Sequence, residues 1–216
     1  MIFSLVTRAD AANDTFVKFQ ISSLQLFSSF SSFIYFQGNE RNIKRLLAAR
    51  DNSNRMIAAL PDDEVELRAK WKDINDYIEK HKDHQFDGAD MSLEAAWSIH
   101  QREFNKIINK RTAGDIRVID NIQIKMEAIL SQYMGYANST TGGYGVSFAD
   151  VPLEQLIANL SKELDALVEA DDKYKELNKL WNYIQKTLLA YNSNVAPFVV
   201  IHTYERMRKE IANLDQ

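Results

Sequence analysis

The stretch LEQLIANLSKELDALV, residues 153–168, decides the fold class, because its apolar residues recur every three or four positions. This spacing places them on one stripe of an α-helix, and most of the residues between them are polar. The stripe consists of Leu153, Leu156, Ile157, Leu160, Leu164, Leu167 and Val168. A helix with one apolar face buries that face against other elements, so the stretch predicts a member of a helix bundle.

Similar patterns run through the rest of the 216-residue chain. They predict eight helices, at residues 15–37, 40–60, 62–82, 92–112, 116–137, 151–170, 172–192 and 197–214. Three of these patterns begin at a proline, namely Pro61, Pro152 and Pro197. Proline is tolerated in the first turn of a helix. No segment alternates as a strand does. We therefore expect an all-α protein, with breaks near Gly38, Gly88, Gly114, Gly143 and Pro197.

The eight predicted helices form two groups of four that resemble each other. Residues 42–79 align with residues 152–189, which brings Trp71 onto Trp181, and two shorter blocks align in the same order. Amphipathic helices produce such matches by periodicity alone, but collinear blocks with tryptophans in register favour a duplication. We predict two tandem four-helix units, residues 1–112 and 113–216.

Composition excludes several functions. Apolar residues make up 45% of the chain and charged residues 26%, as in ordinary globular proteins. The formal net charge is −4, so the basic surface that binds nucleic acid is not expected. The chain has no cysteine, which excludes disulfides, a thiolate nucleophile and cysteine-based metal sites. No serine stands in a nucleophile-elbow motif, so we expect a protein without enzymatic activity and without a cofactor.

The uncharged stretch from Phe19 to Phe36 contains six serines and two glutamines. Serine lets helices pack closely, so this stretch predicts a buried central helix, with a membrane-active helix as the alternative. Before it, the segment MIFSLVTRADAAND, residues 1–14, starts apolar and turns polar at once. This segment is either the cut end of a membrane anchor, a processed leader with the small-x-small sequence at residues 9–11, or simply the start of the first helix.

Four histidines provide candidate metal ligands. His100 and His202 each precede a glutamate by three residues, Glu103 and Glu205, and such a pair shares one helix face. However, His100 lies on an apolar stripe and His202 lies opposite one, so we interpret them as a buried and a surface histidine. The other two, His81 and His84, precede Asp87 and Asp90 at a predicted helix end, where the helix dipole alone favours histidine. We predict no metal site.

Arginines at positions 41, 45, 50 and 55 follow the second predicted helix. Such a row is usually a solvated face, but guanidinium groups in a helical groove can bind a carboxylate. Arg50 falls where the apolar stripe would continue, and the aligned residue of the second group is Leu160. Arg50 therefore either binds an anion or extends to solvent and pairs with a neighbouring acid.

Trp71 and Trp181, with Tyr133, Tyr136 and Phe33, are candidates for lining a ligand pocket between helices, although aromatic residues at helical spacing more often fill a core. Arg50, Trp71 and Trp181 are thus the candidate ligand-binding residues.

Tandem four-helix units, the apolar stub at residues 1–14, the lack of cysteine and the acidic charge resemble the helical extracytoplasmic ligand-binding regions of bacterial chemoreceptors and sensor kinases. The resemblance implies a sensor region that binds a small ligand between helices and passes on a small helix shift, and the arginines make an anionic ligand the expectation. It also implies an extracytoplasmic location and a membrane tether through the N-terminus, and leaves a homodimer or a cytoplasmic location open. The alternative is a structural or assembly subunit that binds partner proteins through its helices.

Overall fold

The computed structural model describes residues 3–88, 90–111, 115–140 and 151–215, and all regular elements within these ranges are helical. The eight α-helices are α1 (Phe3–Tyr35), α2 (Glu40–Ala58), α3 (Val65–His81), α4 (Met91–Lys110), α5 (Val118–Thr140), α6 (Leu153–Ala170), α7 (Lys175–Leu189) and α8 (Pro197–Leu214). One short 3-10 helix, η1 (Asp172–Tyr174), precedes α7. The all-α fold of eight helices is confirmed.

The helix ends follow the local signals in the sequence. Gly38 has a φ of 66° directly after α1, and the Asn39 side chain then caps α2 by accepting a hydrogen bond from the backbone N–H of Asn42. Gly88 has a φ of 89° between α3 and α4, and Pro197 begins α8. Two of the predicted breaks, Gly114 and Gly143, lie outside the described residues.

The first helix is longer than predicted, since α1 begins at Phe3 and not near residue 15. No glycine or proline interrupts residues 3–14, so nothing ends the helical backbone there. The segment is helical from Phe3 onward, as expected if it is the start of the first helix.

The serines of α1 explain how a helix rich in hydroxyl groups is buried. Ser22 and Ser23 donate hydrogen bonds to the backbone carbonyls of Phe19 and Gln20, at 2.9 and 2.8 Å. Such bonds within the helix satisfy the hydroxyl hydrogen and leave the helix free to pack against others. In the described part of the chain, no helix combines the length and apolar character that a membrane crossing requires.

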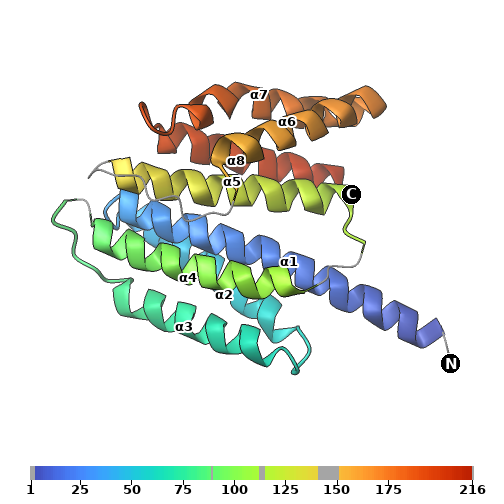
Figure 1. Cartoon of the computed structure of the whole chain (residues 1–216), viewed down its shortest axis with the longest axis horizontal. Helices are drawn as coiled ribbons and strands as arrows, with labels where there is room; N and C mark the ends of the chain where they lie inside the picture. Colours follow the sequence, from blue (N-terminus) through green and yellow to red (C-terminus); the bar gives the residue numbers. More distant parts are fainter. Residues whose placement is uncertain (1–2, 89, 112–114, 141–150, 216) are drawn as a thin grey trace.

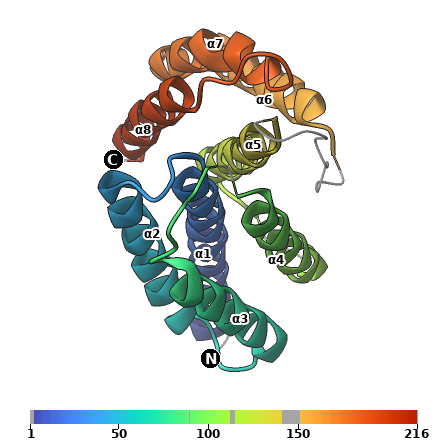
Figure 2. The ribbon, with the colours of Figure 1, turned by 90° about the vertical axis from the view of Figure 1, so that its left-hand side faces the viewer.

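Buried apolar side chains form two clusters. The first comes from α1–α4 and is strongly aromatic, with Phe19, Phe27, Phe30, Phe33, Trp97 and Phe104 among its members. The second comes from α5–α8 and is mainly aliphatic. Figure 2 shows α1 and α5 side by side at the centre, with α2–α4 on one side and α6–α8 on the other.

Each cluster contains one of the aligned tryptophans, on the third α-helix of its group, α3 or α7. The duplication and the division into residues 1–112 and 113–216 nevertheless stay predictions, since helix order alone does not distinguish a repeat from similar amphipathic patterns.

A set of hydrogen-bonded polar side chains lies where α1 and α4 meet α5. The Glu94 carboxyl group accepts bonds from Ser31 Oγ at 3.0 Å and from Asn138 Nδ2 at 2.7 Å, and Gln101 Nε2 donates to Ser131 Oγ at 2.7 Å. Burying these groups is tolerable because they bond to one another. The helices of the two clusters are therefore joined partly by specific polar contacts.

Candidate functional site

Arg50 has a protein carboxylate as its partner. Its Nη1 donates a 2.8 Å hydrogen bond to Glu79 Oε2 on α3, and Asp51 Oδ1 lies 3.9 Å from its Nε. Of the two expectations for Arg50, the structure shows the pairing with neighbouring acids. Glu79 lies on another helix, so the helical pattern around Arg50 did not reveal it.

The two candidate tryptophans fill separate clusters. Trp71 packs edge-on against Phe19 at 5.0 Å and donates its indole N–H to Asn54 Oδ1 at 2.8 Å. Trp181 is buried in the second cluster and donates to Ser161 Oγ at 2.9 Å. The structure thus brings Arg50, Trp71 and Trp181 into no common site, and both indole N–H groups already have protein acceptors.

The histidines have protein partners that explain them. Lys70 Nζ lies 3.3 Å from His100 Nδ1 and also pairs with Glu103, so an ammonium group stands where this pair would hold a metal. His84 Nε2 lies 3.0 Å from Asp90 Oδ2, while the other oxygen of Asp90 caps α4. Among the described residues, no three acidic or histidine side chains are grouped as metal ligands.

The candidate functional site is a cavity of about 290 Å³ between α2 and α8, here called the α2/α8 groove. Helices α1 and α5 also contribute to it. Its lining is Gln25, Ser28, Ser29, Ser32, Arg45, Ala48, Ala49, Asn52, Leu130, Ile201, Glu205 and Arg208. Small side chains on α1 and α2 leave this space open, and polar groups from several helices converge on it, as in ligand pockets.

The rim of the α2/α8 groove carries more positive than negative charge. Arg45 of α2 donates to the Glu205 carboxylate of α8, and Arg41 Nη2 lies 3.8 Å from the same carboxylate. Two guanidinium groups therefore share one acid. The side chains of Arg45 and Glu205 are 26% and 32% exposed, so solvent reaches them. The two guanidinium groups exceed this acid by one positive charge.

One wall of the groove holds an ion pair whose acid is buried and whose arginine side chain is partly exposed. Arg208 donates to Glu127 through Nε and Nη2, both at 2.6 Å, and Gln25 Nε2 donates to the same carboxylate at 3.0 Å. Burial by itself would lower the pKa of Arg208, but the attraction of fully buried Glu127 outweighs it and raises that pKa. Arg208 therefore stays charged and fixes the wall in place.

A smaller cavity of about 110 Å³ continues the groove towards the start of α8 and shares Arg45 and Ile201 with it. Asn42 lines this cavity, and its buried Oδ1 has no hydrogen-bond partner among the described residues. A buried amide oxygen without a donor is uncommon in folded proteins. It adds an acceptor next to the guanidinium groups of the rim.

Sequence reasoning placed Arg45 on a solvated face and did not connect it with Glu205. The two residues are 160 positions apart, and no local spacing links α2 with α8. The one available signal was the excess of arginine on the predicted second helix. It pointed to a guanidinium groove and led to the choice of Arg50, not Arg45, from the row.

The chain was compared with models of protein families, with curated proteins and with solved structures, and none of the three comparisons gave a match.

Proposed function

We propose that this chain is a non-enzymatic helical sensor region of a bacterial signal-transduction protein, and that it binds a small anionic ligand in the α2/α8 groove. The observation that carries the proposal is the shared acid of the rim, where Arg41 and Arg45 both face Glu205. A ligand carboxylate or phosphate would supply the second negative charge. It would compete with Glu205 for Arg45 and so loosen the contact between α2 and α8.

The arrangement of the helices supports a role in signalling. The first turn of α1 and the last turn of α8 lie at the same end of the molecule (Figure 1). A sensor region that is tethered at that end could transmit a movement of α8 to whatever follows it. An extracytoplasmic location is part of this proposal, and it follows from the resemblance to chemoreceptor and sensor-kinase regions.

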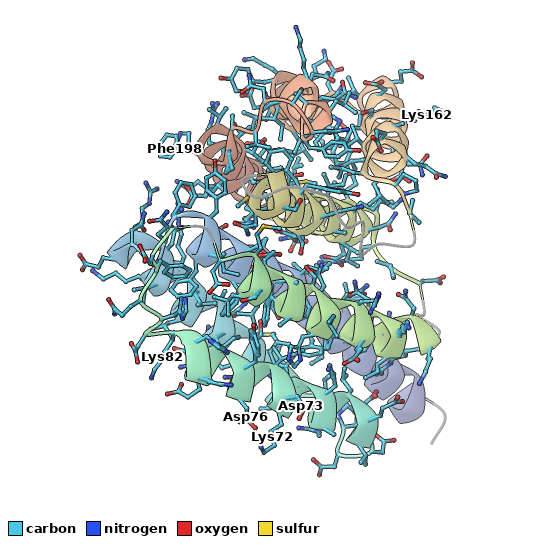
Figure 3. The ribbon with its side chains drawn as sticks, turned by 60° about the vertical axis from the view of Figure 1, so that its left-hand side comes forward. Lys72, Asp73, Asp76, Lys82, Lys162 and Phe198 are labelled. Carbon is cyan, nitrogen blue, oxygen red and sulfur yellow. The ribbon has the colours of Figure 1, made fainter. Side chains whose placement is uncertain are left out.

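A thermal-shift screen against small carboxylates and inorganic phosphate tests the proposal. A ligand at 100 times its dissociation constant should stabilise the native state by about 2.7 kcal/mol. The Arg45→Gln variant should lose this response, because it removes the guanidinium group of the rim. Lys72 on α3 provides a matched control, since it is an exposed cation on the side of the molecule away from α8 (Figure 3).

The Lys72→Gln variant should keep the full response. If no anion stabilises the wild-type chain, or if Arg45→Gln responds as the wild type does, the α2/α8 groove is not the site.

An assembly subunit is the second candidate function, and one observation favours it. Phe198 is 64% exposed and points away from the bundle at the start of α8, next to the partly exposed Val199 (Figure 3). Exposed aromatic side chains are enriched at protein interfaces. Light scattering over a range of concentrations tests self-association. A wild-type dimer that becomes a monomer in Phe198→Ser would favour assembly, and a monomer in both would remove this support.

A further inference from the structure

The floor of the α2/α8 groove consists of hydrogen-bond acceptors. Ser28 and Ser29 donate their hydroxyl hydrogens to the backbone carbonyl of Gln25, at 3.1 and 2.7 Å, and Ser32 donates to that of Ser28 at 2.7 Å. A hydroxyl group whose hydrogen is used in this way still has lone pairs to offer. The Gln25 amide nitrogen is bonded to Glu127, which leaves its carbonyl oxygen as a further acceptor.

The charged donors of the groove come from α2 and α8, and the amide of Asn52 on α2 lines it as well. Arg45 comes from the rim, and Arg208 comes from the wall with Nε and Nη2 already bonded to Glu127. Arg208 also lines the cavity. A molecule bound in the groove therefore meets cationic donors from α2 and α8 and neutral acceptors from α1.

Close packing alone does not explain the serines. The facing helix α2 lines the same cavity with Ala48 and Ala49, so small size is achieved there without a hydroxyl group. Alanine is also the better helix former. The three hydroxyl groups thus place polarity on a surface where the fold does not require it.

We infer that the ligand is a polyhydroxylated carboxylic acid, which would bind through its carboxylate to Arg45 and through its hydroxyl hydrogens to the serine floor. The inference rests on the proposed function and adds the ligand class. An acid without hydroxyl groups would leave the serine oxygens facing methylene groups. A neutral polyol would leave the excess positive charge of the rim unbalanced, and a cationic amine would add to that excess.

Four six-carbon compounds test the ligand class by isothermal titration calorimetry on the full chain. Gluconate carries both a carboxylate and hydroxyl groups, hexanoate carries only the carboxylate, and glucitol carries only hydroxyl groups. Galactonate is included so that the result does not depend on one stereochemistry. At least one of the two sugar acids should bind roughly tenfold more tightly than hexanoate and glucitol, because each hydrogen bond to the floor adds to affinity.

The Ser29→Ala/Ser32→Ala variant removes two acceptors from the floor and retains the helix. It should weaken sugar-acid binding about tenfold and leave hexanoate binding unchanged. The control is Ser22→Ala/Ser23→Ala, which removes two hydroxyl groups of the same kind from α1 outside the groove lining and should bind the sugar acid as the wild type does.

Equal affinity for hexanoate and the sugar acids would overturn the ligand class and leave the proposed anion site standing. An equal loss in the two serine variants would also overturn it, because the effect would then not come from the floor. If neither these acids nor any anion of the wider screen binds, the proposed function itself fails.

Discussion

At the scale of single residues, the protein environment changes the pKa of Glu94. Its carboxyl group is buried between α1, α4 and α5, and burial raises its pKa to about 8, although the hydrogen bonds from Ser31, Asn138 and Ser98 act in the opposite direction. In the unfolded chain a glutamate has a pKa of about 4.3. Between these two values the folded protein holds a proton that the unfolded chain has released.

The linkage between protonation and folding gives the sign of the effect. Because the native state binds the extra proton, the free energy of unfolding falls as the pH rises from about 4.3 to about 8. We predict that Glu94→Gln flattens this part of the profile and is more stable than the wild type at pH 8. Thermal unfolding between pH 4 and 9 measures both profiles, and their difference cancels the other titrating groups. Parallel profiles would contradict the prediction.

At the scale of the elements, replacing glycine by alanine should change the stability of the protein in opposite directions at Gly135 and Gly38. Gly135 lies inside α5, and a Cβ atom there would meet Glu94 Oε1 at 3.5 Å, an ordinary contact. Gly135→Ala should therefore stabilise the protein by about 0.5–1 kcal/mol through helix propensity.

Gly38 is different, because its φ of 66° is left-handed and a Cβ atom would come within 3.1 Å of Phe86 and 3.3 Å of Phe33. We predict that Gly38→Ala destabilises the protein by about 1–2 kcal/mol. Urea unfolding of both variants measures the two changes in the free energy of unfolding. If both variants change stability in the same direction, either the backbone at Gly38 or the contact at Gly135 has been misjudged.

At the scale of the whole molecule, two of the ion pairs that join α8 to other helices should differ in their contribution to stability. The pair between Arg208 and Glu127 connects α8 to α5, and Glu127 is fully buried. Arg208→Met would leave that carboxylate without a counter-charge and should cost about 3–5 kcal/mol. The pair between Arg45 and Glu205 connects α8 to α2 and is partly exposed, so Arg45→Gln should cost only about 0–1 kcal/mol.

Chemical denaturation of both variants checks this ranking, and a Glu127→Gln/Arg208→Met double variant should recover much of the lost stability. Equal costs for the two pairs would contradict it. The predicted ranking has a consequence for function, because α8 would stay fixed on α5 while its contact with α2 changed.

The sequence determined the helices and their ends. The 3.6-residue period, the cap at Asn39, the turn at Gly38 and the start of α8 at Pro197 all act within a few residues of the chain. Such local signals can be read from the sequence without knowledge of the tertiary structure. The start of α1 was missed because the apolar pattern is weak in residues 3–14, although the backbone there contains nothing that ends a helix.

Only the tertiary structure decided which helix faces pack against each other. A helical period shows that one side of α2 is buried, but it does not show that Arg50 meets Glu79 on α3 or that Arg45 meets Glu205 on α8. The α2/α8 groove likewise combines serines of α1 with charged residues of α8, far apart in the chain. The physical reason is that apolar burial is non-directional: it gives each helix an inner side, and only the packing of all the helices together selects its neighbours.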